Sequence, residues 1–164
     1  MEELPRAQPL DTVPLRCAIQ SFPSIADGRS SSLKNQMNEK VVLVVEDEPA
    51  LVAIYRRVLE HNGYQVLSAL SGEDALEVVK KHDGNIDLLL SDIVLQGMSG
   101  RELVWRLWES HPEIYVILAS GYADQDGALQ MMEENRVAFI AKPFDLNLLL
   151  DMIRETIGDP APQT

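Results

Sequence analysis

The feature of this sequence that most constrains its fold is an uninterrupted apolar run from Val41 to Val45 (VVLVV). A continuous β-branched run of this length is typical of a strand that is buried on both faces of a parallel sheet. Beyond the acidic turn that follows, Pro49 suits a first helical turn, and apolar residues recur at helical spacing until Asn62-Gly63 ends the pattern. The first unit of the chain is therefore predicted to be a strand, a loop and a helix.

The same alternation continues along the chain. Further strands are predicted at 64–69, 86–91, 114–119 and 137–141, and further helices after the N-cap Ser71 and at 101–109, 123–135 and 145–157. Five strands that alternate with five helices through short loops and right-handed crossovers predict an α/β fold with a doubly wound, five-stranded parallel sheet. Functional groups of such folds gather at the carboxyl ends of the strands.

The chain is expected to hold one globular domain, because 164 residues with 46% apolar composition leave no room for a second one. Residues 1–39 are rich in Pro, Ser and Gln and lack periodicity, so they are predicted to be a flexible N-terminal leader. The domain is expected at 40–158, followed by a tail at 159–164 without an output domain. A product that started at Met37 would keep the whole domain.

Acidic residues dominate the predicted domain. The chain carries a net charge of -12, and residues 1–40 hold five acids and five bases, so the whole excess lies in 41–164. Such a domain is repelled by phosphate backbones and anionic lipid, which argues against nucleic-acid or membrane binding. No apolar run approaches the ~20 residues that span a bilayer, and the first residues lack the basic and apolar stretches that are typical of a signal peptide. The single cysteine, Cys17, has no internal disulfide partner, and the sequence predicts a soluble cytoplasmic protein.

Carboxylates follow two of the predicted strands. Glu46 and Asp47 come directly after the first strand, and Asp92 follows the third. Carboxylates held close together raise one another's pKa and destabilise a fold unless a cation neutralises them. The site therefore calls for a hard, oxygen-seeking ion such as Mg²⁺. The alternative is a solvated acidic rim, which is common at strand ends.

A hydroxyl and an ammonium group are predicted at the same edge of the sheet. Ser120 lies at the end of the fourth strand, and Lys142 at the end of the fifth. A carboxylate nucleophile, a divalent cation, an ammonium group and a hydroxyl donor are what phosphoryl transfer to an aspartate requires. Taken singly, Ser120 would more often be a helix cap and Lys142 a surface charge, but together they favour a phosphoryl-accepting site at Asp92.

Other kinds of site are excluded by the chemistry. The turn Glu46-Asp47-Glu48-Pro49 has no glycine and repels anions, so it does not suit a nucleotide-binding fold. The histidines are scattered over helix ends and loops, which supports neither a zinc site nor a catalytic triad: His61, His82 and His111. The protein is not expected to be an enzyme, beyond its own phosphorylation and dephosphorylation.

Four segments resemble the receiver domains of response regulators in two-component signalling. They are 41–49, 88–100 (LLLSDIVLQGMSG), 117–121 (ILASG) and 141–144 (AKPF), and the resemblance covers about residues 40–158. It implies a flavodoxin-like sheet with the strand order 2-1-3-4-5. It also implies that Asp92 accepts a phosphoryl group from a histidine kinase or a histidine phosphotransfer protein.

The resemblance further implies a role for each residue of the site. Mg²⁺ would be bound directly by Asp47, Asp92 and the backbone carbonyl of Val94, and through water by Glu46, which replaces a common Asp. Ser120 and Lys142 would contact the phosphoryl group.

Other positions of the resemblance concern the switch and the lifetime of the phosphoryl group. Phe139 matches a switch aromatic, for which plain core packing is the alternative. Gln96 replaces a common proline four residues after the acceptor and frees the loop backbone there. Val94 and Tyr122 match positions that tune the access of hydrolytic water, and because an apolar Val94 cannot orient that water, slow autodephosphorylation is predicted.

Two functions of different class stay open. In the first, the chain is a phosphorylatable receiver, either stand-alone or within a phosphorelay. Its output would pass by protein contact through the face of the fourth helix, fifth strand and fifth helix. In the second, it is a pseudo-receiver that binds partners without phosphorylation. The intact acceptor, acid pair, hydroxyl and lysine favour the first.

Overall fold

The structure, a computed structural model, describes residues 39–121 and 136–160. Within these ranges, five strands and four helices follow one another in the order β1 (Val41–Val45), α1 (Pro49–His61), β2 (Gln65–Ala69), α2 (Gly72–Lys81), β3 (Leu88–Asp92), α3 (Gly100–Ser110), β4 (Tyr115–Ser120), β5 (Val137–Ala141) and α5 (Leu146–Ile157). The helix predicted at 123–135 lies outside the described residues. The observed elements confirm the predicted alternation of strands and helices.

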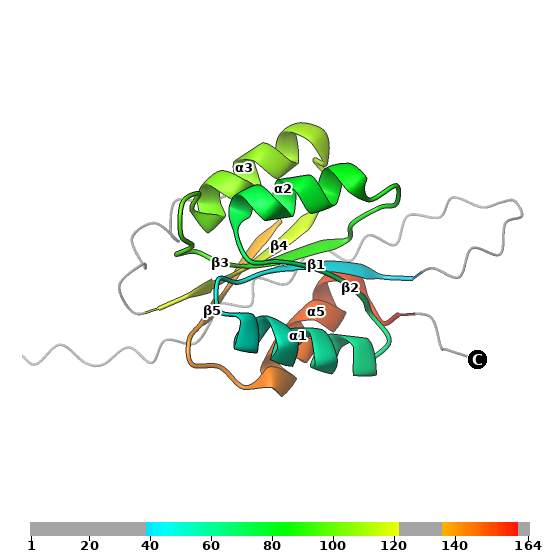
Figure 1. The fold of residues 1–164 in the computed structure, drawn as a ribbon. Helices are drawn as coiled ribbons and strands as arrows, with labels where there is room; N and C mark the ends of the chain where they lie inside the picture. Colours follow the sequence, from blue (N-terminus) through cyan, green and yellow to red (C-terminus); the bar gives the residue numbers. More distant parts are fainter. Residues whose placement is uncertain (1–38, 122–135, 161–164) are drawn as a thin grey trace, which may run out of the picture.

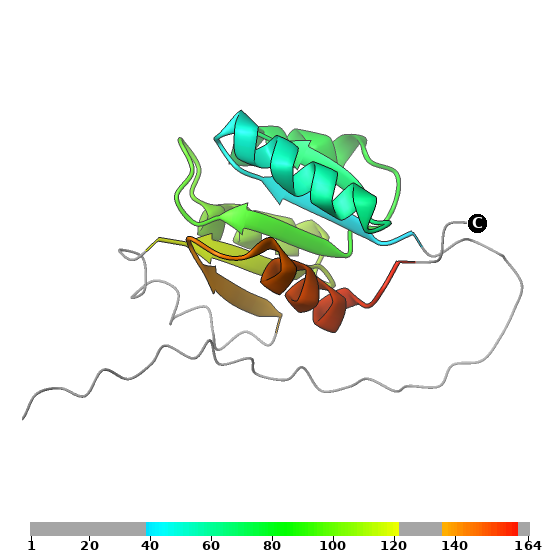
Figure 2. The same ribbon diagram turned by 90° about the horizontal axis from the view of Figure 1, so that it is seen from below.

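The strands form one parallel sheet in the order β2-β1-β3-β4-β5. This order confirms the flavodoxin-like sheet that the resemblance to receiver domains implies. Helices α2 and α3 cover one face of the sheet, and α1 and α5 cover the other (Figure 1). Figure 2 views the sheet from the face that α1 and α5 cover. Because every crossover returns the chain to the same end, the carboxyl ends of all five strands meet at one edge.

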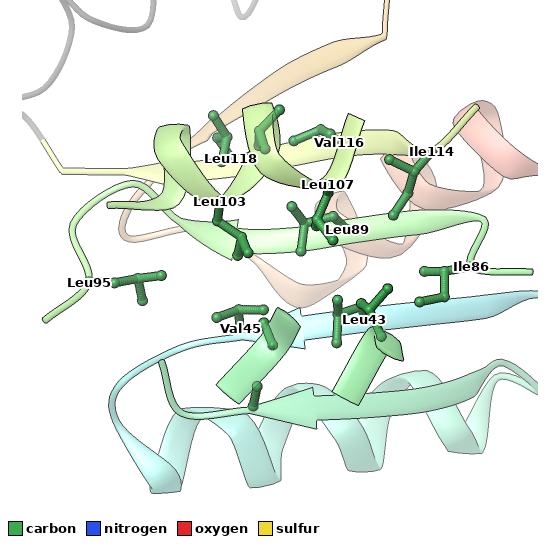
Figure 3. Close-up of a cluster of buried hydrophobic side chains, with 14 of the residues drawn as sticks. Leu43, Val45, Ile86, Leu89, Leu95, Leu103, Leu107, Ile114, Val116 and Leu118 are labelled. Atoms are coloured by element: carbon green, nitrogen blue, oxygen red, sulfur yellow. The ribbon is translucent and has the colours of Figure 1, made fainter. Parts of the chain in front are cut away.

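The apolar run of β1 contributes to two separate cores. Leu43 and Val45 pack under α2 and α3, in the cluster drawn in Figure 3. Val42 and Val44 pack on the opposite face, in the cluster under α1 and α5. Successive side chains of a strand point to opposite faces, so a strand covered on both sides needs apolar residues at every position. This explains why β1 is continuous in apolar residues rather than alternating.

Three helices begin with a side-chain cap at the carboxyl edge of the sheet. Ser71 Oγ accepts a hydrogen bond from Asp74 N (3.1 Å), which confirms the predicted cap of α2. Ser99 Oγ caps α3 and Asp145 Oδ1 caps α5 in the same way. These caps satisfy N–H groups that the first helical turn leaves without a partner.

No described helix is both long enough and apolar enough to cross a membrane.

Strand β3 begins two residues later than predicted, and Asp87, the residue before it, bonds to the neighbouring strands at the amino edge of the sheet. Its Oδ2 accepts from Val41 N (2.8 Å) and its Oδ1 from Lys40 Nζ (3.3 Å). The backbone of Asp87 also bonds to Val41 O and to Tyr115 N. Asp87 thus ties the starts of three neighbouring strands together at the edge opposite to the predicted site.

Candidate functional site

Four of the predicted site residues lie at the carboxyl ends of four neighbouring strands. Glu46 follows β1, Asp92 ends β3, Ser120 ends β4, and Lys142 follows β5. The register places Asp92 opposite Ala119, one residue before Ser120. Lys142 N donates to Ser120 O (2.8 Å), which extends the pairing of β4 and β5 by one step. The sheet itself therefore gathers these residues.

The ammonium group of Lys142 joins the two acidic strands. Nζ donates to Asp92 Oδ2 (2.6 Å) and to Glu46 Oε2 (2.8 Å). All three side chains are largely buried, with exposed fractions of 24% for Lys142, 14% for Asp92 and 5% for Glu46. Charge-assisted hydrogen bonds of this length are among the strong ones in proteins. One ammonium group thus serves as the counter-ion of two carboxylates.

Asp92 is held at both of its carboxylate oxygens. While Oδ2 accepts from Lys142, Oδ1 accepts from Val94 N (2.9 Å). The carbonyl oxygen of Asp92 accepts from Ser91 Oγ (2.9 Å). The two carboxylate contacts fix the side chain of Asp92, and the neighbouring residue Val94 is 59% exposed. A fixed and reachable carboxylate has the placement that a nucleophile needs.

Gly100 brings the start of α3 directly against Asp92. Its N–H donates to Ile93 O (2.9 Å), and a Cβ at this position would overlap the carbonyl oxygen of Asp92. That obstacle is backbone, which cannot rotate away as a flexible side chain can. Sequence reasoning missed this contact. The available signal was a glycine directly after the Ser99 cap, a place where a helix gains nothing from glycine itself.

The charges of the site shift the pKa values of two groups. Burial raises the pKa of Glu46 above its ordinary value, and the hydrogen bond and charge of Lys142 offset this only in part. Burial alone would lower the pKa of Lys142, but Asp92 and Glu46 outweigh it and hold that pKa well above its usual range. Lys142 is therefore a permanent cation, whereas the ionised form of Glu46 depends on Lys142 beside it.

A second contact that sequence reasoning missed is an aromatic stack two residues after Lys142. Tyr55 of α1 stacks on Phe144, with ring centroids 5.9 Å apart and planes 19° apart. Phe144 follows Lys142 and Pro143, so the stack holds the loop after β5 against α1. Burial raises the pKa of the Tyr55 phenol above its ordinary value, and the charges of the site act on it as well. An aromatic pair at this distance is typical of favourable packing.

The donor set suits Mg²⁺ by its chemistry, although the carboxylates are not assembled around a metal position. Asp47 lies beside Glu46 and is half-buried. In 39–121 and 136–160, no three His, Cys, Asp or Glu side chains are arranged to hold a metal ion. In this structure the ammonium group of Lys142 offsets part of the charge of Glu46 and Asp92, and Mg²⁺ binding stays a prediction. Even so, carboxylates and a backbone carbonyl are the ligands that Mg²⁺ prefers, and Glu46, Asp47, Asp92 and Val94 offer them.

The remaining predicted residues lie farther from this cluster or outside the described part. Phe139 on β5 pairs with Leu118 and is half-buried against the core under α2 and α3. This placement fits core packing, and its role as a switch stays a prediction. Tyr122 lies outside the described residues.

The sequence matches one protein-family model and several known proteins. The model of the response regulator receiver domain matches residues 42–154. The chain is 37% identical over 116 residues to sensor kinase CckA of Brucella abortus (strain 2308), covering 71% of this chain but 12% of that protein. It is 32% identical over 119 residues to sporulation initiation phosphotransferase F of Bacillus subtilis (strain 168), covering 73% of this chain and 94% of that protein.

Solved structures match the fold over the same part of the chain. A response regulator receiver domain protein from Clostridium thermocellum superposes with a TM-score of 0.67 at 26% identity, covering 72% of this chain and 94% of that one. A CheY-like receiver domain protein from Methanospirillum hungatei JF-1 gives a TM-score of 0.65 at 29% identity, covering 73% and 94%. The similarity thus extends over nearly the whole of these two structures.

Proposed function

This chain belongs to the response regulator receiver domain family of two-component systems, and from this premise we propose that it accepts a phosphoryl group on Asp92. The observation that carries the proposal is the 2.6 Å hydrogen bond between Lys142 Nζ and Asp92 Oδ2 at the carboxyl edge of the sheet. It places a permanent cation beside a fixed carboxylate. A pseudo-receiver that binds partners without phosphorylation is the alternative.

The proposed reaction is an in-line transfer from a phosphohistidine. A carboxylate oxygen of Asp92 forms a bond to phosphorus while the bond from phosphorus to the histidine nitrogen breaks, and the electron pair of that bond stays on the imidazole. Lys142 and the Ser120 hydroxyl would contact the phosphoryl oxygens. Glu46, Asp47, Asp92 and the Val94 carbonyl would hold Mg²⁺, which when bound offsets the negative charge of the phosphoryl group.

The partners and setting follow from the same proposal. The donor would be a histidine kinase or a histidine phosphotransfer protein, in line with the similarity to a sensor kinase and to a phosphotransferase. The output would be a protein contact, with a leader at 1–39, the receiver at 40–158 and a tail at 159–164. We place the protein in the cytoplasm and assign it no catalysis beyond its own phosphorylation and dephosphorylation.

The decisive experiment is phosphorylation of the whole chain by acetyl phosphate with Mg²⁺, read by intact mass. Wild type is expected to gain one phosphoryl group, and Asp92→Asn none, because an amide is not a nucleophile for this transfer. Asp87→Asn is the matched control, since Asp87 lies at the opposite edge of the sheet and should leave the gain intact. No Mg²⁺-dependent gain in wild type would refute the phosphorylatable receiver and favour the pseudo-receiver.

The exposed Val94 side chain is expected to prolong the lifetime of the phosphoryl group. It lies beside the acceptor and is 59% exposed, so it meets water without offering a hydrogen bond to orient it. Replacing Val94 with Asn supplies such a group and is expected to speed loss of the phosphoryl group by about tenfold, or about 1.4 kcal/mol in the barrier. The decay is followed by intact mass after removal of acetyl phosphate, with Val94→Ala as an apolar control. Equal lifetimes in all three proteins would contradict this role.

A further inference from the structure

The loop between Asp92 and α3, residues 93–99, has few backbone restrictions of its own. It contains no proline, and Gly97 at its exposed tip adopts a positive φ of 78°. Glycine and the absence of proline leave a loop many conformations to choose from. Its conformation must therefore be set by contacts with other parts of the molecule.

Glu73, in the first turn of α2, makes such a contact. Its Oε1 accepts a hydrogen bond from Met98 N (3.2 Å). The same carboxylate lies against the loop tip, since a Cβ added to Gly97 would be 3.0 Å from Oε1. The preceding Gly72 lies against the buried Met98 side chain, where an added Cβ would be 3.0 Å from Met98 Cβ. The first turn of α2 thus holds both the backbone and the side chain of Met98.

The loop so held connects two contacts of the acceptor. At its start, Val94 N donates to Asp92 Oδ1 (2.9 Å), and the Val94 carbonyl is a proposed Mg²⁺ ligand. At its end, Gly100 packs against the carbonyl of Asp92. Met98 lies between these two points. When the loop is fixed at Met98, the carbonyl group of Val94 can adopt fewer orientations.

We propose that Glu73 is a positioning residue for the phosphoryl-accepting site, acting through Met98 on the loop that carries the Val94 carbonyl. The inference rests on the proposed function and adds a residue to it. Glu73 touches neither Asp92 nor Lys142 through a hydrogen bond, so it acts on the site only through the loop. Groups that orient a metal ligand in this indirect way are typically worth about 10- to 100-fold in metal affinity.

Three variants separate the hydrogen bond from the charge. Glu73→Ala removes both, Glu73→Gln keeps an oxygen that can accept from Met98 N, and Glu77→Ala removes a charge from the same helix at an exposed pair with Lys80. Each full-length variant is titrated with Mg²⁺ while backbone amide signals are followed by NMR. Hydrogen exchange of the Met98 amide is measured without Mg²⁺, and the unfolding transition confirms that each variant is folded.

The expected result is specific to the bond. Glu73→Ala should bind Mg²⁺ about tenfold more weakly and exchange the Met98 amide faster, Glu73→Gln should recover most of both, and Glu77→Ala should match wild type. Wild-type Mg²⁺ affinity in Glu73→Ala would overturn the inference while leaving the proposed function intact. If Glu73→Gln or Glu77→Ala weakened Mg²⁺ binding as much as Glu73→Ala does, the inference would also be overturned. Loss of a negative charge would then explain the lower affinity without the hydrogen bond to Met98. Absence of Mg²⁺ binding in wild type would overturn the proposed function and this inference together.

Discussion

Replacing Lys142 with methionine is expected to destabilise the domain by about 3 kcal/mol at neutral pH, because breaking a buried ion pair on one side leaves uncompensated charge. Glu46 and Asp92 both rely on this ammonium group, and both are largely buried. Methionine keeps much of the side-chain length but supplies no charge and no hydrogen bond. Urea unfolding of wild type and variant measures the difference in the free energy of unfolding.

The loss caused by Lys142→Met should depend on pH in a defined direction. Without Lys142, the pKa of Glu46 in the folded state rises further, because the hydrogen bond and charge that lower it are gone. The folded variant then holds a proton at a pH where the unfolded chain has released it, so the variant gains stability as the pH falls through that raised pKa. The gap to wild type should therefore narrow as the pH approaches the ordinary value of 4.5.

A matched substitution tests whether burial is the cause of this loss. Lys80→Met removes an ammonium group from an ion pair with Glu77 on the surface of α2. Exposed pairs contribute little, because water already solvates both charges. The control variant is expected to unfold almost as wild type does at every pH. Equal losses in the two variants would show that the buried cluster around Lys142 has no special energetic role.

Replacing Gly100 with alanine is expected to destabilise the domain by about 1 to 3 kcal/mol, the usual range for forcing an extra group into a packed interior. The added Cβ would overlap the carbonyl oxygen of Asp92 and also lie 3.1 Å from Ile93 Cα. Relief requires α3 or the end of β3 to shift. Because Asp92 belongs to the displaced backbone, its amide signal and that of Val94 should move in NMR spectra of the variant.

Gly121→Ala is the control for this prediction. Among residues 39–121 and 136–160, no atom lies within 4 Å of a Cβ at Gly121, and the φ of Gly121 does not lie in the positive range. Alanine there should leave stability unchanged or raise it by up to about 1 kcal/mol, since it restricts the unfolded chain. Thermal and urea unfolding of wild type and both variants measure these changes in stability. A Gly100→Ala protein as stable as Gly121→Ala would mean that the contact with Asp92 relaxes at little cost.

Much of the fold could be predicted because its signals are local and repeated. The run of β1 requires cover on both faces, and the regular return of helical spacing requires crossovers, which together predict a doubly wound parallel sheet. The observed strand order was expected from the resemblance to receiver domains. The meeting of Glu46, Asp92 and Lys142 follows from their places at strand ends. Their assignments to phosphoryl transfer and metal binding stay predictions, as do the domain boundaries.

The contacts that sequence reasoning missed depend on side-chain geometry between distant segments. The pairing of Glu73 with Met98 joins residues 25 positions apart, and the stack of Tyr55 on Phe144 joins α1 to the loop after β5. No local sequence pattern predicts contacts between side chains that are so far apart in the chain. The sequence placed Lys142 at the same edge of the sheet as the acids, but it did not reveal that one ammonium group bonds to both Glu46 and Asp92. Mg²⁺ binding at these acids stays a prediction.

The alternation of β1 between two cores also decides which acid becomes the partner of Lys142. Glu46 continues the strand by one residue, since its N–H still donates to Ala69 O (3.3 Å), and its side chain is buried whereas Asp47 is half-buried. A slip of β1 by one residue would exchange the two apolar faces and turn the acids over with them. The packing of the β1 valines in the two cores therefore sets the register of the strand. That register in turn decides that Glu46, and not Asp47, lies beside Lys142.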